Sequence, residues 1–241
     1  MLIFLDLETT GLEANDTICS IAILDAKNQK YYYELINEGK KIPPQASSIH
    51  HITNEMLKDK PKFQESKIYK FLHDNNHVEN TIVAHNVQFC IQKLALAGLI
   101  WRGGVIDTLR VTKHLIPECE LFSLQVLRYE LKLYKQEREE KEFFGIKNAL
   151  FAHNALADAI VVKLLFTYLL ELSSEDEMKE LSFKNVLLNK FTFGKYKGKY
   201  IEEISMNDRG YLEWMLSATD IDEDIKYSIN YYLRGQNENC C

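Results

Sequence analysis

The first apolar run of the chain ends in two carboxylates. Leu2 to Leu5 are all apolar, which predicts a strand buried on both faces. Asp6 and Glu8 continue this strand, and side chains two residues apart in a strand project from the same face. Neighbouring carboxylates repel each other and are costly to bury unless a cation neutralises them. The pair therefore predicts a site for a hard cation such as Mg²⁺, with a solvated strand end beside a turn as the alternative.

The residues that follow predict an α/β domain. Further strands are expected over 17–24, 31–36, 81–84 and 105–106, and helices over 63–72, 89–99, 108–115, 123–131 and 154–172. Strands that come first, followed by strands that alternate with helices, indicate a mixed sheet flanked by helices. The charged run from Glu137 to Glu142 predicts a solvated face or a loop.

A change of composition near residue 173 predicts a domain boundary. The stretch 173–180 is polar and acidic, as linkers often are. Beyond it, segment 190–199 has four lysines that alternate with aromatic residues around two glycines. Such a segment is typical of a nucleic-acid-binding surface, and equally of a β-hairpin that packs its aromatic residues. We expect a domain over residues 1–172, a linker over 173–189 and a small accessory domain over 190–241.

Composition excludes several classes of protein. All apolar runs are shorter than the roughly 20 residues of a membrane span, and no basic flank precedes the first, so neither a membrane segment nor a signal peptide is expected. The five cysteines lack metal-knuckle spacing, which favours reduced thiols and a cytoplasmic location. The net charge of −6 argues against a protein that coats nucleic acid, but not against an enzyme that holds a strand end through metal ions.

Two further segments place polar residues beside predicted secondary structure. His153 stands five residues before Asp158, and since each residue turns a helix by about 100°, the two cannot share a face of one helix. If Asn154 is the N-cap, His153 can instead fold over from a loop. His85 and Asn86 lie where a predicted strand gives way to a helix. Taken alone, each of these segments is explained as well by hydrogen bonds to the local backbone.

Together and in this order, the three segments resemble the motifs of the DnaQ-like exonucleases, the 3′–5′ exonuclease superfamily of the DEDDh type. Residues 6–11 (D-L-E-T-T-G) are similar to the first motif, residues 85–90 (H-N-V-Q-F-C) to the second and residues 153–158 (H-N-A-L-A-D) to the third. The C-terminal stretch F-G-K-Y-K-G-K is similar to the small extra domain of exodeoxyribonuclease X relatives. The resemblance implies an α/β fold of the ribonuclease-H-like type: a mixed β-sheet flanked by helices, with a small C-terminal accessory domain.

The resemblance also implies roles for individual residues. Asp6, Glu8 and Asp158 would hold a first Mg²⁺ or Mn²⁺ ion, and Asp6 would bridge to a second. His153 would be the general base that takes the proton of the attacking water, and Leu12 would contact the terminal base. The products would be 5′-mononucleotides. The residues expected to bind the substrate are Thr9, Thr10, Leu12, His85 and Asn86.

One position departs from the family pattern. The second motif of the family ends in aspartate, whereas this chain has Cys90 there and no carboxylate in the residues that follow directly. In the family this carboxylate supports the second metal ion, and a neutral thiol is a poor ligand for Mg²⁺. The resemblance therefore implies an intact first metal site and general base, together with an impaired second metal site.

Four functions fit these residues. The first is a metal-dependent 3′–5′ exonuclease that degrades single-stranded or frayed 3′ ends of DNA. The second is a nucleic-acid-binding module that keeps the fold and has lost efficient catalysis through Cys90. The third is an RNA 3′-trimming exonuclease, because the first motif does not distinguish DNA from RNA. The fourth is a proofreading subunit of a polymerase, although no segment of the sequence identifies a protein partner.

Overall fold

The computed structural model forms two compact units. It describes residues 1–147, 151–218 and 221–238. The first unit consists of Met1–Val111 with Leu121–Ser182, and the second of Thr112–Glu120 with Phe183–Cys241. Each unit has its own apolar core, so each is described by itself below.

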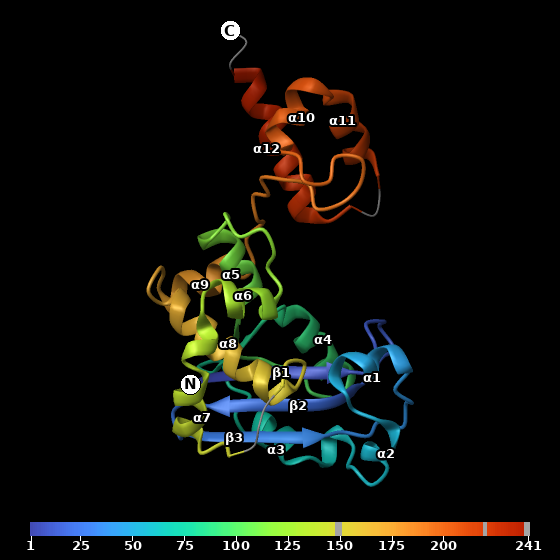
Figure 1. Ribbon diagram of the computed structural model, residues 1–241, viewed down its shortest axis with the longest axis vertical. Coiled ribbons are helices and arrows are strands. Elements are labelled where there is room, and N and C mark those ends of the chain that lie inside the picture. Colours follow the sequence, from blue (N-terminus) through green and yellow to red (C-terminus); the bar gives the residue numbers. More distant parts are fainter. Residues whose placement is uncertain (148–150, 219–220, 239–241) are drawn as a thin grey trace. The chain divides into compact units, whose positions relative to one another are not determined.

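A five-stranded mixed sheet forms the centre of the first unit (Figure 1). Its strands are β1 Leu2–Thr9, β2 Ile18–Asp25, β3 Lys30–Leu35, β4 Thr81–Ala84 and β5 Gly104–Asp107. They lie in the order β3-β2-β1-β4-β5, which puts β1 in the middle. The β1–β2 and β2–β3 pairs are antiparallel, and the β1–β4 and β4–β5 pairs are parallel. The predicted mixed sheet is confirmed.

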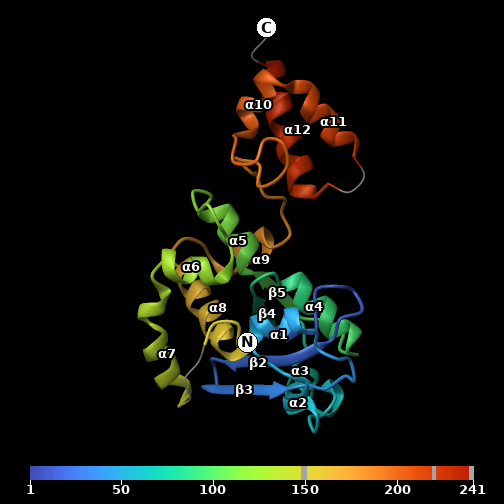
Figure 2. The ribbon, with the colours of Figure 1, turned by 45° about the vertical axis from the view of Figure 1, so that its right-hand side comes forward.

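Helices flank this sheet, as predicted (Figure 2). Up to residue 181 they are α1 Pro44–His50, α2 Asn54–Leu57, α3 Lys67–Asp74, α4 Val87–Leu96, α5 Thr108–Leu115, α6 Leu124–Glu130, α7 Glu137–Phe144, α8 Ala155–Leu169 and α9 Glu175–Leu181, with short 3₁₀ helices at Phe63–Glu65 and Leu133–Lys135. The longest of them, α8, packs against β1 and β2, and twelve of its fifteen residues are buried. It is therefore the helix whose side chains are best placed to meet those of the central strand.

Alternation along β1 assigns its side chains to two faces of the sheet. Its odd-numbered residues enter the main apolar cluster together with residues of α3 and α4: Ile3, Leu5, Leu7, Leu72 and Leu94. Phe4 lies on the opposite face, where its ring contacts that of Phe166 in α8 with the centroids 5.4 Å apart. Asp6 and Glu8 share the face of Phe4, because residues two apart in a strand project the same way. The strand therefore presents its two carboxylates toward α8.

The charged run from Glu137 to Glu142 is helical and belongs to α7. Glu137 forms an ion pair with Arg128 of α6, and Glu140 forms one with Lys163 of α8 at 2.7 Å. These four side chains are only 14% to 21% exposed. The expectation of a solvated face or a loop was wrong for Glu137 and Glu140, because the neighbouring helices α6 and α8 supply their counter-charges.

Residues 173–189, expected as a linker, contain α9, which packs against β5. Ser174 is the N-cap of α9, and its hydroxyl accepts a hydrogen bond from the N–H of Glu177 at 3.2 Å. Acidic residues fill the first turn of the helix, where the helix dipole favours negative charge. The acidic composition of this stretch thus belongs in part to a helix start. The division into residues 1–172, 173–189 and 190–241 stays a prediction.

The described part of the second unit contains three helices around a small core. They are α10 Ile201–Asn207, α11 Arg209–Ser217 and α12 Glu223–Glu238. The buried residues of this core are Phe191, Ile201, Ile204, Leu212, Met215, Ile225, Ile229 and Leu233. This core is separate from the apolar cluster that packs against the sheet, and all of its residues belong to the second unit.

The lysine-rich segment 190–199 forms a tight loop at the edge of this core. A single bridge between Lys190 and Tyr200 closes the loop, and both of its glycines adopt positive φ. Lys195 forms an ion pair with Asp208 at 3.0 Å, so its charge is partly used within the unit. Phe191 is buried as a packing hairpin would require, whereas the side chains of Lys197 and Lys199 are exposed.

Two expectations from composition can be compared with the structure. No helix among the described residues is long and apolar enough to cross a membrane. The described cysteines, Cys19, Cys90 and Cys119, are buried thiols. Cys240 and Cys241 lie outside the described residues, so their expected reduced state stays a prediction.

Candidate active site

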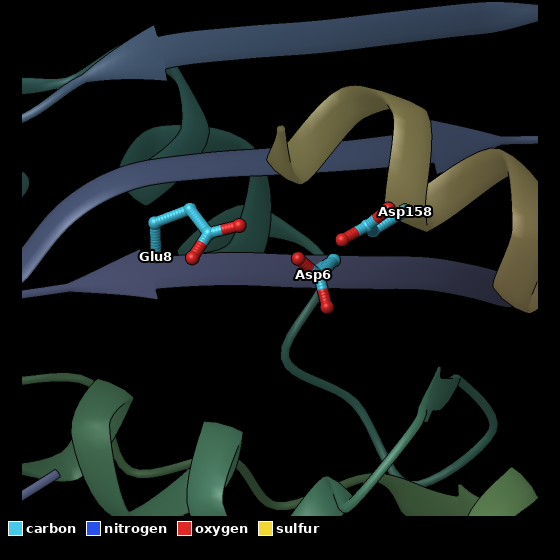
Figure 3. Close-up of side chains that lie close together, drawn as sticks. All are labelled: Asp6, Glu8 and Asp158. Atoms are coloured by element: carbon cyan, nitrogen blue, oxygen red, sulfur yellow. The ribbon is translucent and has the colours of Figure 1, made fainter. Parts of the chain in front are cut away.

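Three carboxylates meet between β1 and the first turns of α8 (Figure 3). Asp6 and Glu8 come from the strand and Asp158 from the helix. Each offers one oxygen, and these oxygens all lie within 4.8 Å of one another. Within residues 1–147, 151–218 and 221–238, this is the one group of three or more His, Cys, Asp or Glu side chains close enough to share a metal ion.

The surroundings of this cluster oppose its negative charge. Burial raises the pKa of Asp6 well above its usual value, and the charges of Asp158 and Glu8 raise it further. Burial, with the charge of Asp158, raises the pKa of Glu8 to about 7. Burial raises the pKa of Asp158 to about 6, although a hydrogen bond from Gln125 acts in the opposite direction. The cluster is therefore stabilised by whatever brings positive charge to it, a proton or a cation.

The donor set fits a divalent cation such as Mg²⁺ or Mn²⁺. All three donors are carboxylate oxygens, the ligands that these hard ions prefer. Burial raises the pKa values of Glu8 and Asp158, which opposes the ionised form of both groups. A cation would replace the protons that these carboxylates otherwise take up.

The start of α8 explains how Asp158 reaches the site and where His153 lies. The side chain of Asn154 accepts hydrogen bonds from the N–H groups of Leu156 at 3.1 Å and Ala157 at 3.4 Å, so Asn154 is the N-cap. His153 precedes the helix with φ of 59°, and its side chain is exposed. Its backbone N–H hydrogen-bonds to Asp158 and helps to lower the pKa of that carboxyl. His153 therefore stands in a loop beside Asp158, as the N-cap argument requires.

Cys90 lies in α4, where it is buried within the main apolar cluster and only 3% exposed. Burial raises the pKa of the thiol well above its usual value, and the charges of Asp6 and Asp107 raise it further. Cys90 is thus a neutral thiol within electrostatic reach of Asp6. It adds no carboxylate to the cluster.

The last residue of β1 and the loop that leads to β2 carry three of the residues expected to bind the substrate. The hydroxyl of Thr9 donates to the carbonyl oxygen of Gly11 at 2.6 Å, and the hydroxyl of Thr10 donates to Asp16 at 3.0 Å. Both hydroxyls are therefore used to shape the loop. Leu12 is 85% exposed, which leaves its apolar side chain available for a partner.

A buried lysine also holds this loop, and the sequence did not identify it. Lys93 of α4 is 4% exposed, and its Nζ donates to the carbonyl oxygens of Glu13 at 2.6 Å and Asp16 at 2.8 Å. Lys40 forms an ion pair with the side chain of Asp16 at 2.7 Å. The signal that could have found Lys93 is a lysine on the apolar side of a predicted helix, where a charge needs a partner.

His85 and Asn86, the pair from the second motif, differ in their surroundings. His85 has both ring nitrogens within hydrogen-bonding distance of protein oxygens, Thr108 Oγ1 at 3.1 Å and the carbonyl of Phe122 at 2.8 Å. The backbone N–H of Asn86 donates to the carboxylate of Asp107 at 3.0 Å, and its side chain is exposed. The ring of His85 is therefore hydrogen-bonded within the fold, whereas the side-chain amide of Asn86 is exposed to solvent.

Gln125 of α6 also contacts the cluster, although no pattern in the sequence selects it. Its Nε2 donates to Oδ1 of Asp158 at 2.6 Å. A neutral amide 33 positions away from its partner in the sequence leaves no local pattern to recognise. It is nonetheless in direct contact with one of the three carboxylates.

Comparison with known proteins assigns this chain to a class of enzymes. Residues 3–166 match the family model described as Exonuclease, and residues 191–220 match the one described as Exodeoxyribonuclease X-like C-terminal. The first match covers well over half of the chain, so the chain belongs to this exonuclease family. It is a phosphodiester hydrolase of the 3′–5′ exonuclease class.

Individual proteins of known function are similar to this chain. The chain is 27% identical to exodeoxyribonuclease 10 of Escherichia coli (strain K12), over 98% of this chain and 100% of the relative. Exonuclease X, solved in complex with 5′ overhanging duplex DNA, has a TM-score of 0.60 at 27% identity, over 76% of this chain and 99% of that chain. The nuclease domain of 3′hExo, a DEDDh family member bound to rAMP, shares the fold with a TM-score of 0.51 at 12% identity, over 74% of this chain and 93% of that chain. The predicted resemblance to DnaQ-like exonucleases and exodeoxyribonuclease X relatives is confirmed.

Replacing Asp6 by Asn should stabilise the metal-free protein at neutral pH. Glu8 and Asp158 have folded-state pKa values of about 7 and about 6. In the unfolded chain both lie at roughly 4. The folded protein therefore binds more protons between these values, and its stability falls as the pH rises from about 4.5 to about 7. Asp6→Asn removes one repelling charge, and each kcal/mol gained raises Tm by roughly 2–4 °C.

Thermal unfolding in EDTA from pH 5 to pH 8 measures this effect. The gain of Asp6→Asn should be largest at pH 7.5 to 8 and shrink toward pH 5, and excess Mn²⁺ should raise the Tm of the parent more than that of the variant. Asp59→Asn, at an exposed aspartate, should leave Tm unchanged. A parent and an Asp6→Asn variant with equal Tm at pH 8 in EDTA would contradict the repulsion described above.

Proposed function

We propose that this chain is a divalent-metal-dependent exonuclease that removes nucleotides from 3′ ends of DNA and releases 5′-mononucleotides. The observation that carries the proposal is the convergence of Asp6, Glu8 and Asp158 within 4.8 Å. Membership of the exonuclease family supports it, as does the similarity to exodeoxyribonuclease 10 over nearly the whole chain. The solved complex of exonuclease X with 5′ overhanging duplex DNA supports DNA as the substrate.

Asp6, Glu8 and Asp158 would hold the Mg²⁺ or Mn²⁺ ions. When bound, a pair of such ions activates water and neutralises the charge on the leaving oxygen. The chain contributes the geometry: the antiparallel pairing of β1 with β2 fixes Asp6 and Glu8, and the Asn154 cap fixes the turn that carries Asp158. Substrate phosphate would complete the coordination, as is usual for Mg²⁺ in enzymes of phosphate chemistry.

His153 is proposed to be the general base. Its side chain is exposed, so water can reach it directly, and it stands just before the N-cap of the helix that carries Asp158. The ordinary pKa of an imidazole lies near neutral pH, which suits proton transfer from water. His153 would take the proton of the water that attacks the terminal phosphodiester.

The substrate is proposed to lie along the β1–β2 loop. Leu12 would contact the terminal base through its exposed side chain, and Thr9 and Thr10 would keep the loop in place beside the terminal nucleotide. Asn86 would contact the substrate through its exposed amide, whereas His85 would act by holding its own segment. In the second unit, the exposed Lys197 and Lys199 are suited to contact phosphates.

The direct test is degradation of end-labelled single-stranded DNA, duplex DNA with a 5′ overhang, and RNA in Mg²⁺, Mn²⁺ or EDTA. We expect stepwise shortening from the 3′ end of DNA with either metal, release of 5′-mononucleotides and no shortening in EDTA. Asp6→Ala should be inactive in all conditions, which excludes a contaminating nuclease. Equal activity in EDTA would disprove the proposal, and faster loss of RNA than of DNA would favour the RNA-trimming alternative.

His153→Ala should lower turnover far more than affinity for DNA. General-base catalysis typically contributes about 10² to 10⁴ in rate. The imidazole contributes little to phosphate binding, so the Kd for DNA should change by less than about threefold. This corresponds to at most about 0.7 kcal/mol of binding free energy. Single-turnover rates and equilibrium DNA binding separate the two effects. His73→Ala, at an exposed histidine of α3, is the matched control, and equal losses of rate and affinity in His153→Ala would mean that His153 binds substrate instead.

Cys90 is proposed to weaken the second metal site. It occupies the position of the family's fourth carboxylate, and its buried neutral thiol offers no hard oxygen ligand. The same observation favours a second candidate function, a nucleic-acid-binding module with little catalysis. The two differ in whether restoring the carboxylate restores turnover.

Cys90→Asp should raise Mg²⁺-dependent turnover by one or more factors of ten, each worth about 1.4 kcal/mol of barrier. The parent should be more active in Mn²⁺ than in Mg²⁺, because Mn²⁺ binds protein sites more tightly and accepts more varied ligands. Without metal, the new carboxylate is buried near Asp6 and should lower Tm, and Mg²⁺ should restore it. Cys90→Asn, similar in shape but uncharged, should not gain activity. Turnover by folded Cys90→Asp that is equal to or below the parent would refute the weakened second site.

A further inference from the structure

A chain of hydrogen bonds leads away from the carboxylate cluster through Asp158. Gln125 donates from Nε2 to Oδ1 of Asp158 at 2.6 Å. Its own Oε1 accepts a hydrogen bond from Nη1 of Arg128 at 3.1 Å. Arg128 in turn is bound by Glu137 through two parallel contacts, one of them between Nη2 and Oε2 at 2.6 Å. Each member of the chain therefore has a partner on both sides, except Glu137 at its end.

The chain determines which way the amide of Gln125 points. A guanidinium has only donors, so Arg128 can be satisfied by Oε1 of Gln125 and never by its NH₂ group. The NH₂ group is therefore left to face Asp158. Because the Arg128–Glu137 pair is bidentate and the two side chains are only 14% and 21% exposed, the guanidinium itself has little freedom to turn.

Three helices contribute to this arrangement. Gln125 and Arg128 are three residues apart on α6 and lie on one face of it, while Glu137 is the first residue of α7. Both α6 and α7 pack against α8, which carries Asp158 (Figure 2). The position of the carboxylate therefore depends on contacts that bring all three helices together, and not on the start of α8 alone.

A carboxylate that binds a cation with one oxygen must hold its plane at a defined angle. With Oδ1 engaged by Gln125, rotation of the Asp158 carboxylate about its χ2 bond would break a short hydrogen bond. Figure 3 shows the carboxylate of Asp158 pointing toward Asp6. The amide thus restricts the rotation of the carboxylate that faces Asp6.

We propose that Gln125 is a positioning residue of the metal site: anchored by Arg128 and Glu137, it keeps Asp158 in the orientation that binds a divalent cation. This inference rests on the proposed function, because it requires that Asp158 is a metal ligand. Hydrogen bonds that orient metal-binding carboxylates typically contribute about 10- to 100-fold to metal affinity or activity.

The test compares Gln125→Leu with the parent by calorimetry with Mn²⁺ and by steady-state degradation of single-stranded DNA. Leucine is close to glutamine in size and lacks the donor. We expect the Mn²⁺ Kd to rise about 10- to 100-fold and kcat at a fixed, subsaturating metal concentration to fall in parallel, with KM for DNA changed less than about threefold. Excess Mn²⁺ should recover part of kcat, which a merely structural defect would not allow. Gln92→Leu, at an exposed glutamine of α4, is the matched control and should behave as the parent.

A second variant separates positioning from folding. Arg128→Met leaves Gln125 in place and removes its anchor, so it should weaken Mn²⁺ binding by a smaller factor than Gln125→Leu. The double variant should lose little more than Gln125→Leu alone, because residues in one hydrogen-bonded chain are not additive. If Gln125→Leu does not fold, Gln125→Asn, which keeps the polarity but is one methylene shorter, replaces it and should give the same direction of change.

The outcomes distinguish this inference from the proposed function. A parent that neither binds Mn²⁺ nor degrades DNA would remove the proposed function itself. A parent that does both, together with a folded Gln125→Leu that binds Mn²⁺ as tightly as the parent, would overturn the positioning role. A lower Tm of Gln125→Leu with an unchanged Mn²⁺ Kd would overturn it as well and would make Gln125 a packing residue only.

Discussion

The mutual repulsion of three carboxylates is the constraint on which the rest of this structure depends. Asp6, Glu8 and Asp158 would move apart if the chain allowed it, since burial opposes their ionisation, Asp158 raises the pKa of Asp6 and of Glu8, and Glu8 raises that of Asp6. The two elements that hold them have little freedom to move: β1 is the central strand and is paired with β2 along the residues that carry Asp6 and Glu8, and α8 is almost wholly buried. The folding energy of the sheet and its covering helix therefore maintains a local arrangement that is unfavourable by itself. A divalent cation that binds between the carboxylates would relieve this repulsion, and the relief would contribute to its affinity.

The polar groups around the cluster hold it in place without neutralising it. Asn154 caps α8, Gln125 engages one oxygen of Asp158, and Lys93 ties α4 to the β1–β2 loop. The lysine, whose charge could have paired with the cluster, instead donates to backbone carbonyls of the loop. The positive charge of Arg128 is matched by Glu137. The negative charge of the carboxylates therefore remains available to bind a cation from solution.

Features set by local periodicity were predictable, and those set by remote partners were not. The alternation of β1 predicts that Asp6 and Glu8 share a face, and the N-cap preference of Asn154 predicts that His153 lies before the helix; neither needs the rest of the fold. The Gln125 contact and the buried Lys93 depend on residues far away in the sequence, so no window of the sequence contains both partners. Glu140 was mistaken for solvated surface for the same reason, because its partner Lys163 lies 23 positions away. Composition reports the charge of a segment but not the counter-charge that the fold brings to it.

Cys90 has a consequence for the chemistry of oxidation. Thiols react with oxidants as thiolates, and the thiolate of Cys90 is suppressed by burial and by the neighbouring carboxylates Asp6 and Asp107. A sulfur atom within electrostatic reach of the carboxylate cluster would otherwise be an obvious target for sulfenic acid formation. Burial and the two carboxylates keep Cys90 a neutral thiol. This protects it from peroxide and from alkylating reagents while the protein is folded. The thiol becomes reactive only when α4 separates from the sheet, so its modification would report unfolding of the site rather than its redox state.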